Sequence, residues 1–300
     1  MARQFTVVGL GEILWDLLPT GHQLGGAPTN FAYISTLLGD HGLVASRVGQ
    51  DDLGNETTRR LDTLGLDRTY LQLDSTHPTG TVSVDLDKAG QPIFVIHENV
   101  AWDFLNWSTG WPDLAAAADA VCFGTLAQRS PSSRETIHNF LQHSRPDAIR
   151  VFDVNLRQAF YSEEILHESI SIATIVKMNH DEFPIIRRLL GINGDDASTL
   201  LKFGLKLVCL TRGNQGSLLI TENEREEHPG FLVKVVDTIG AGDAFTAALV
   251  HHYLRGASLG TMSDAANRVG SWVATQSGGT PVTSREQLRR SLASLTLNKA

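Results

Sequence analysis

The sequence predicts an α/β protein with a mostly parallel central sheet covered by helices on both faces. Two observations support this prediction. From residue 119 onward, apolar runs alternate regularly with helical segments, and each run is apolar almost throughout, as in AVCFGTL, IRVFDVNLR, ATIVKMN, KLVCLTRG and GSLLI. Strands of this kind are typical of a parallel sheet buried on both faces. The 300 residues, of which 42% are hydrophobic, suffice for one large domain of this class or two small ones.

The overall composition limits the partners and the compartment of the protein. Its 25 basic and 33 acidic residues give a net charge of −8, and no basic stripe is present, which argues against binding to nucleic acid. Cys122 and Cys209 each lie inside an apolar run and are expected to be buried thiols in a reducing compartment. The N-terminus shows no signal-peptide pattern, and no apolar run reaches membrane-spanning length. We therefore expect a cytoplasmic protein without a membrane partner.

The first predicted strand, Phe5 to Gly11, ends in Gly-x-Gly. A dinucleotide-binding fingerprint would need a third glycine at position 14, where this chain has Leu14. Residues 12–17 are better interpreted as a continuation of the strand. The sequence contains no Gly-Lys dipeptide, which excludes a Walker A phosphate loop. Any ATP must therefore be held by other means.

Paired glycines precede the next predicted element. Gly25 and Gly26 come before an apolar helix that includes Asn30 and extends through Leu38. On their own, these glycines favour a plain connection, and Asn30 would be a surface polar residue. Leu43 to Val48 then predicts a second strand, and GQDDLGNETTRRLDTLG a structural helix with an acidic start.

Residues 79–96 predict a β-hairpin with one polar face. Val82, Val84 and Leu86 alternate with polar residues, a turn is expected at 87–90, and a second strand extends over 92–96. The plain alternative is an ordinary edge hairpin.

Polar residues follow several of the predicted parallel strands. Ligands of such sheets gather beyond the carboxyl ends of the strands, so these residues are candidates for function. Arg157 ends DVNLR, Asn179 and Glu182 follow the strand ATIVKM, and the turn 211–216 follows KLVCL. Two structural alternatives stay open: a salt bridge for Arg157, and a helix cap formed by Asn179 with Glu182.

The stretch from 233 to 254 predicts an anion-binding turn. Residues 233–236 have the composition of a strand, residues 240–242 form a glycine-rich turn, and a helix packed on one face follows. Backbone N–H groups in the first turn of a helix have no intrahelical partner and attract anions. Asp243 lies in this first turn. It is either a carboxylate that complements the helix dipole or a base that accepts a proton, and spacing alone does not decide.

A family resemblance joins these observations. DTIGAGDAF closely resembles the C-terminal D-T-x-G-A-G-D motif of the ribokinase-like (PfkB) carbohydrate kinases, and GLGEILWDLLPTGHQLGGAPTNFA resembles their N-terminal segment. The N-x-x-E and T-[KR]-G-x-x-G motifs lie between them, in family order, from about Phe5 to Pro281. ENVAWDF and DVNLR resemble segments of fructokinase-like members. The resemblance implies one ribokinase-like domain over residues 1–300, with a small β-sheet lid formed by about 12–18 and 79–104.

The resemblance also implies a role for each candidate residue. In the family, the Gly-Ala-Gly amides form an anion hole and the last Asp of the motif is the catalytic base, which here are Gly240, Ala241, Gly242 and Asp243. The sugar would be held by Asp16, Gly25, Gly26, Asn30, Ala101 and Arg157. The nucleotide would contact Asn179, Glu182, Thr211, Gly213, Gly216 and Asn267, with Glu182 near Mg²⁺ through water. Asp237, with the loop 275–281, would hold a monovalent cation such as K⁺, unless it only caps the turn.

The predicted reaction is transfer of the γ-phosphoryl group of ATP to a hydroxyl of a sugar. No lysine or arginine occurs from Gln4 to Ser46, which favours a free sugar over a sugar phosphate, and the fructokinase-like segments favour fructose. Ribose, 2-keto-3-deoxygluconate and a nucleoside are alternative substrates, and a non-catalytic sugar-binding regulatory protein is the alternative class. The exposed edge of the lid predicts a homodimer, with a monomer protected by charged edges as the alternative.

Overall fold

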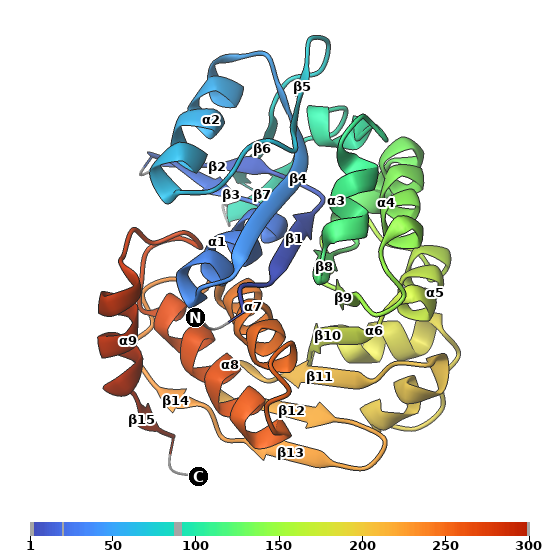
Figure 1. The fold of residues 1–300 in the computed structure, drawn as a ribbon, viewed down its shortest axis with the longest axis vertical. Helices are drawn as coiled ribbons and strands as arrows, with labels where there is room; N and C mark the ends of the chain where they lie inside the picture. The colour runs from blue at the N-terminus through green and yellow to red at the C-terminus, as the bar shows by residue number, and fades with distance from the viewer. Residues whose placement is uncertain (1–2, 20, 87–91, 299–300) are drawn as a thin grey trace.

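The computed structural model describes residues 3–19, 21–86 and 92–298, and it confirms the predicted α/β fold. Among these residues, the large sheet has the strand order β13-β12-β11-β10-β9-β8-β1-β4-β5. Helices cover both of its faces (Figure 1). In chain order, its strands are β1 (Thr6–Leu10), β4 (His41–Gly49), β5 (Leu71–Asp74), β8 (Ala120–Phe123), β9 (Ile149–Asp153), β10 (Ile175–Asn179), β11 (Leu207–Thr211), β12 (Ser217–Ile220) and β13 (Arg225–His228).

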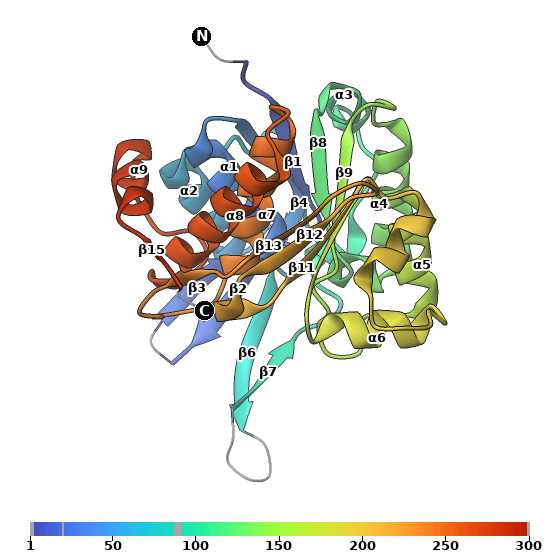
Figure 2. The same ribbon diagram turned by 90° about the horizontal axis from the view of Figure 1, so that it is seen from below.

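Two layers of helices enclose the sheet. Figure 2 shows α1, α2, α7, α8 and α9 on one side and α3, α4, α5 and α6 on the other. Neighbouring strand residues enter different cores: Val7 packs with the first layer and Val8 with the second. The helices are α1 (Ala27–Leu38), α2 (Asp52–Leu64), α3 (Trp111–Ala117), α4 (Pro131–His143), α5 (Glu163–Ile172), α6 (Glu182–Leu189), α7 (Ala241–Tyr253), α8 (Leu259–Ala274) and α9 (Arg285–Ala293).

One edge of the sheet differs from the prediction. The strands from β5 to β11 are parallel, but β12 pairs antiparallel with β11, and β13 antiparallel with β12. The predicted strand GSLLI therefore exists with the opposite direction. The reason is its short connection of residues 212–216, since a parallel pair would need a long crossover. Strand β13, with the sequence REEH, has no apolar signal and was not predicted.

A second, smaller sheet projects from the body of the molecule. Its strand order is β3-β2-β6-β7, and β6 and β7 extend furthest from the body (Figure 2). Its strands are β2 (Leu14–Leu18), β3 (Gly21–Gly25), β6 (Gly80–Leu86) and β7 (Pro92–Ile96). The antiparallel hairpin of β6 and β7 is confirmed, and its predicted turn at 87–90 lies outside the described residues. Strand β3 was not predicted.

Two predicted strands are corrected. Residues 12–17 do not continue β1. The strand ends before Gly11, whose φ of +143° suits glycine, and the chain then begins a strand of the small sheet at Leu14. Residues 233–236 form no strand: only Phe231–Leu232 (β14) pairs, with Thr296–Leu297 (β15). Val236 is 62% exposed and its N–H donates to the carbonyl of Ala274. The β-branched residues of this segment have no neighbouring strand to pair with among the described residues, so they form no strand.

Three further features bear on the predictions. Cys122 and Cys209 are buried free thiols, as predicted. Residues 101–104, which the predicted lid included, form a 3-10 turn. Trp102 within this turn is fully buried in the same core as Val8. Among the described residues, no helix is long and apolar enough to cross a membrane.

Candidate active site

The first turn of α7 forms the centre of the candidate site. Gly240 precedes the helix with φ of +76°, a conformation that glycine adopts at little cost. A Cβ atom at Gly240 would lie 2.4 Å from the Cα atom of Gly279, so the glycine-rich turn and the loop after α8 touch backbone to backbone. N–H groups in the first turn of a helix have no intrahelical partner and can bind an anion. Here the N–H of Ala241 donates to the carbonyl oxygen of Thr238 at 3.2 Å.

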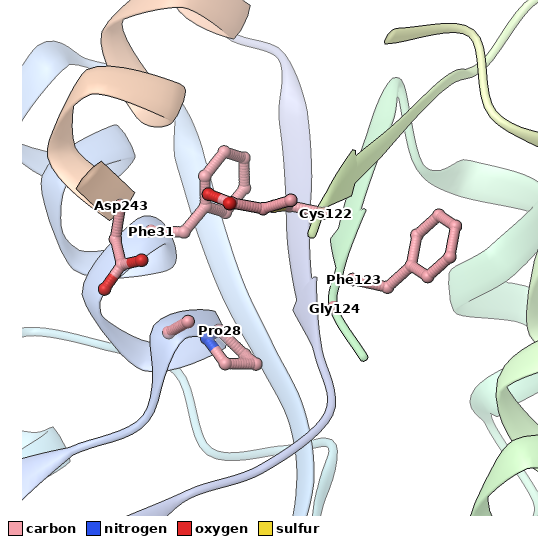
Figure 3. Close-up of a pocket in the computed structure, with 8 residues that line it drawn as sticks. Pro28, Phe31, Cys122, Phe123, Gly124 and Asp243 are labelled. Carbon is pink, nitrogen blue, oxygen red and sulfur yellow. The ribbon is translucent and has the colours of Figure 1, made fainter. Parts of the chain in front are cut away.

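Asp243 lies in a small pocket between α7, α1 and the ends of β8 and β9. The pocket is lined by Ala27, Pro28, Phe31, Cys122, Phe123, Gly124, Asp153 and Asp243. Figure 3 shows Asp243 at the start of α7, close to Pro28 of α1, whereas Phe123 points away from it. Burial and then the charge of Asp153 raise the pKa of Asp243 to about 6, although hydrogen bonding by Asn30 and the charges of Lys177 and Arg157 oppose the shift. A carboxyl with this pKa is ionised at neutral pH yet basic enough to take a proton.

A buried charge network supports this pocket from the sheet. The ammonium of Lys177 on β10 donates to both carboxylate oxygens of Asp153, at 3.0 and 3.2 Å, and Thr246 of α7 donates to the same carboxylate at 2.9 Å. A Cβ atom at Gly242 would lie 2.8 Å from Nζ of Lys177. Burial alone would lower the pKa of Lys177, but the charges of Asp153, Glu182 and Asp243 raise it. A cation is thus held directly against the glycine-rich turn.

Glu12 adds a second buried carboxyl near Asp243. The residue is 3% exposed, and Oε2 has no hydrogen-bond partner among the described residues. Burial and the charge of Asp243 raise the pKa of Glu12 to about 7, against the backbone N–H groups of Glu12 itself and of Ala27 and the charge of Arg157. The carboxyl therefore lies where the N-terminus of α1 meets the end of β1.

The predicted sugar residues come together at this place. Asp16 lies on β2, and a Cβ atom at Gly25 would be 2.7 Å from its Oδ2 atom. A Cβ atom at Gly26, whose φ is +105°, would meet the carbonyl oxygen of Glu12 at 2.5 Å. Backbone contact therefore requires glycine at position 26, whereas a side chain at position 25 would displace Asp16. Burial raises the pKa of Asp16 to about 6, with Arg157 lowering it and Asp237 raising it. Asn30 contacts Asp243 directly, because its Nδ2 donates to Oδ2 of Asp243 at 2.8 Å.

The two other predicted sugar residues, Arg157 and Ala101, differ in exposure. The side chain of Arg157 is exposed, and its charge lowers the pKa of Glu12, Asp16 and Asp243. Ala101 is fully buried in its 3-10 turn. Its contact with the sugar stays a prediction.

The N-x-x-E segment forms the helix cap that was its structural alternative. Oδ1 of Asn179 accepts from the N–H of Glu182 at 2.9 Å, and Glu182 in return accepts from the N–H groups of Asn179 at 2.7 Å and Leu156 at 2.8 Å. Both carboxylate oxygens of Glu182 are thus occupied. Within the described part of the chain, no group of three acidic, histidine or cysteine side chains could hold a metal ion. These residues do not offer a preformed Mg²⁺ site, and the magnesium role of Glu182 stays a prediction.

Other predicted nucleotide residues also have structural contacts. Thr211 ends β11, and Gly213 begins the turn that follows it with φ of +58°. A Cβ atom at Gly216 would lie 1.9 Å from the carbonyl oxygen of His228, so a side chain is excluded there. Asn267 of α8 is buried and donates to Oγ of Ser217 at 2.7 Å, which ties α8 to β12. Their contacts with nucleotide stay predictions.

Asp237 joins the glycine-rich turn to the loop after α8. Its Oδ1 accepts from the N–H of Ile239 and its Oδ2 from the N–H of Gly278, each at 3.0 Å. These are the turn-capping contacts that were the alternative to a cation role. The cation role stays a prediction.

Comparisons with known proteins show the family of this chain. The sequence profile described as "pfkB family carbohydrate kinase" matches residues 19–285. This chain belongs to the pfkB family. The fructokinase of Escherichia coli is 31% identical over 80% of this chain and 82% of its own.

Solved structures of pfkB relatives share the whole ribokinase-like fold. A sugar kinase from Pyrococcus horikoshii in complex with ATP is 27% identical, with a TM-score of 0.79, and covers 96% of this chain and 99% of its own. A fructokinase from Vibrio cholerae with bound fructose, ADP and calcium is 25% identical, with a TM-score of 0.78, over 96% and 99%.

Two site residues of this pfkB chain were missed from the sequence. Lys177 is a lone lysine inside the apolar strand ATIVKMN, and Glu12 is a lone carboxyl after Gly-Leu-Gly. A charged residue in an otherwise buried run was the available signal, because burial of an unpaired charge is costly. Glu12 and Asp16 also precede residue 19, where the family match begins, so their placement depends on the structure.

Proposed function

We propose that this pfkB-family chain transfers the γ-phosphoryl group of ATP to a hydroxyl of a free sugar, with fructose as the substrate. The observation that carries the proposal is Asp243, a carboxyl of raised pKa that lines the pocket and lies in the first turn of a helix preceded by a glycine-rich turn. The relatives support the choice of reactants, since one is named a fructokinase and two solved relatives hold ATP, or fructose with ADP.

The proposed chemistry needs a base and an anion site side by side. The carboxylate of Asp243 takes the proton of the attacking hydroxyl while the new O–P bond forms and the bond from the γ-phosphorus to the β-phosphate oxygen breaks, which leaves ADP. The amides of Gly240, Ala241 and Gly242 and the ammonium of Lys177 stabilise charge on the transferred group. Mg²⁺ and K⁺ are the expected cofactors of the proposed reaction.

The charges of the acceptor side support a neutral substrate. Three carboxyls lie on the proposed acceptor side: Glu12, Asp16 and Asp243. The charge of Arg157 lowers the pKa of each of them. A phosphate on the sugar would meet these carboxylates with no lysine or arginine from residues 4–46 to pair with it. A free sugar has only hydroxyls to bind, which carboxylates and the amide of Asn30 can hold.

The small sheet is proposed to act as a lid. It projects from the body of the molecule (Figure 2), and its strand β2 carries Asp16. Gln158, which follows Arg157 in the chain, donates to the carbonyl oxygen of Phe94 on β7 at 2.7 Å, so the lid contacts the loop after β9. Closing a lid over bound sugar would exclude water, to which the phosphoryl group would otherwise be lost.

The proposed substrate is tested by measuring ADP formation with a panel of acceptors. We expect free fructose to stimulate ATP turnover much more than fructose 1-phosphate, fructose 6-phosphate, ribose, 2-keto-3-deoxygluconate or a nucleoside. ATP without acceptor gives the background rate. A preference for a phosphorylated sugar would contradict the proposal, and ATP turnover that no acceptor stimulates would favour the non-catalytic alternative.

A further inference from the structure

Asn30 contacts the proposed base directly, although it belongs to the sugar segment by sequence. It lies in the first turn of α1, is 3% exposed, and its Nδ2 donates to Oδ2 of Asp243 at 2.8 Å. Because a carboxylate only accepts hydrogen bonds, the amide must present its nitrogen to Asp243 and its oxygen elsewhere. Oδ1 of Asn30 is buried and has no hydrogen-bond partner among the described residues.

The Asn30 amide is held from the opposite side by backbone. A Cβ atom at Gly279 would lie 2.5 Å from Nδ2 of Asn30 and 2.6 Å from its Oδ1. A Cβ atom at Gly240 would lie 3.3 Å from the same Nδ2. Gly279 does not have a left-handed φ, so a side chain there would be opposed by the Asn30 amide and not by backbone conformation.

The loop that presses on Asn30 is itself fixed. The N–H of Gly278 donates to Asp237 at 3.0 Å, and Asp237 also accepts from the turn before α7. Asn30 therefore fills the space between this loop and Asp243. Its hydrogen bond occupies Oδ2 of the carboxylate and leaves Oδ1 for a proton from the substrate.

We propose that Asn30 is a positioning residue, which orients the carboxylate of Asp243 for proton transfer while Gly279 holds the Asn30 amide in place. This inference rests on the proposed kinase function and assigns Asn30 a task beyond binding the sugar. The other charged groups that face Asp243 are Asp153 and Lys177 from the sheet, Arg157 from the loop after β9, and Glu12 from the end of β1.

Asn30→Ala tests the inference through the pH dependence of kcat. The hydrogen bond from Asn30 lowers the pKa of Asp243, so its removal raises that pKa. The acidic limb of kcat should then move by about one pH unit toward higher pH, the effect of losing one hydrogen bond to a charged group. At its plateau, kcat should fall roughly 10- to 100-fold because the base is misplaced. A raised KM for fructose with an unchanged kcat and pH profile would show that Asn30 only binds sugar, which overturns the inference.

Gly279→Ala provides a second test that keeps the Asn30 side chain. The added methyl group displaces the amide, so kcat and the acidic limb should change in the same direction as in Asn30→Ala. Ser35→Ala is the matched control, because Ser35 is a buried polar residue further along α1 and away from the pocket. It should leave kcat and the pH profile unchanged. An unaltered pH profile in a folded Gly279→Ala variant counts against the inference.

A measurement without turnover separates this inference from the proposed function. The carboxyl carbon of Asp243 can be titrated by NMR in the wild type, in Asn30→Ala and in Ser35→Ala. Asn30→Ala should raise the pKa of Asp243, whereas Ser35→Ala should not. An unchanged pKa in Asn30→Ala would overturn the positioning role even if the kinase reaction is confirmed. A raised pKa would support that role even if the acceptor is not fructose.

Discussion

At the scale of single residues, the site depends on carboxyls whose burial makes them more basic. Glu12, Asp16 and Asp243 have pKa values raised to between about 6 and about 7, and for each of them burial is the largest cause. A buried carboxylate of raised pKa is unfavourable for folding at neutral pH. Carboxyls of this kind, which lower stability at neutral pH, are typical of functional sites.

Asp243→Asn distinguishes a catalytic base from a helix-start carboxylate. Asparagine can still cap a helix and accept a hydrogen bond, but it cannot take a proton at neutral pH. If Asp243 is the base, kcat should fall by roughly 10²–10⁴ while fructose affinity survives. The wild-type kcat should rise as the pH passes through about 6 and level off above it, because the ionised form is the base.

The thermal midpoint of Asp243→Asn gives an independent check. The pKa of this carboxyl in the folded protein lies above its value in the unfolded chain. Its contribution to stability is therefore greatest below the unfolded pKa and is lost as the pH rises through about 6. At pH 8 the variant should therefore unfold no earlier than the wild type. Asp113→Asn is the matched control, since Asp113 is an exposed first-turn carboxylate of α3 and should leave kcat unchanged. A folded Asp243→Asn variant with near-normal kcat would refute the proposed mechanism.

At the scale of elements, the site is formed where two helix N-termini meet. The first turns of α1 and α7 contribute Asn30 and Asp243, and the loop after α8 closes the space between them through Gly279. The strands β9 and β10 supply the Asp153–Lys177 pair beneath the glycine-rich turn. Each element thus contributes one or two side chains, and their arrangement depends on backbone contacts that admit only glycine.

Gly240→Ala should damage the turn more than its φ angle alone explains. Alanine in a left-handed conformation costs about 1–2 kcal/mol. At position 240 the methyl group would also collide with the Cα atom of Gly279, so the loss of unfolding free energy should be larger and kcat should fall. Gly256→Ala is the matched control, because Gly256 has φ of +66° and a Cβ atom there would have no other atom within 4 Å. Equal stability losses and a normal kcat in both variants would contradict the packing explanation, as measured by denaturant unfolding.

At the scale of the whole molecule, the small sheet raises the question of assembly. Its outer strand β7 exposes Ile93 and Phe94, which are 46% and 55% accessible. Exposed apolar residues on an edge strand favour pairing with another chain. We propose that two copies pair through this sheet, which would also protect its edge from non-specific association.

Light scattering of the purified protein tests the dimer. We expect twice the chain mass for the wild type and a single chain mass for Phe94→Lys, because a charge on β7 opposes the pairing. Leu73→Lys is the control: Leu73 is 58% exposed on β5, an edge strand of the large sheet, and its replacement should leave the dimer intact. A wild-type protein with a single chain mass would show that the alternative, a monomer, is correct.

The sequence by itself determined the features that depend on local pattern. The alternation of apolar runs with helices predicted the α/β sheet, and the glycine-rich turn followed by Asp243 predicted an anion site with an acidic first turn. The hairpin of β6 and β7 followed from period-two alternation. These patterns predict structure well because they depend on burial and backbone conformation within a few neighbouring residues. Composition without a pairing partner was insufficient, as residues 233–236 show.

Only the tertiary structure decided which distant residues meet. Asn30 and Asp243 are 213 residues apart, and no local pattern indicates that one donates to the other. Lys177 became a site residue because parallel pairing of β9 with β10 brings it to Asp153. Ala101 is buried because its segment turns into the core, which the sequence did not indicate. The physical reason is the same in each case: hydrogen bonds, charges and steric contacts act through space, and the chain has to fold before these groups are within reach.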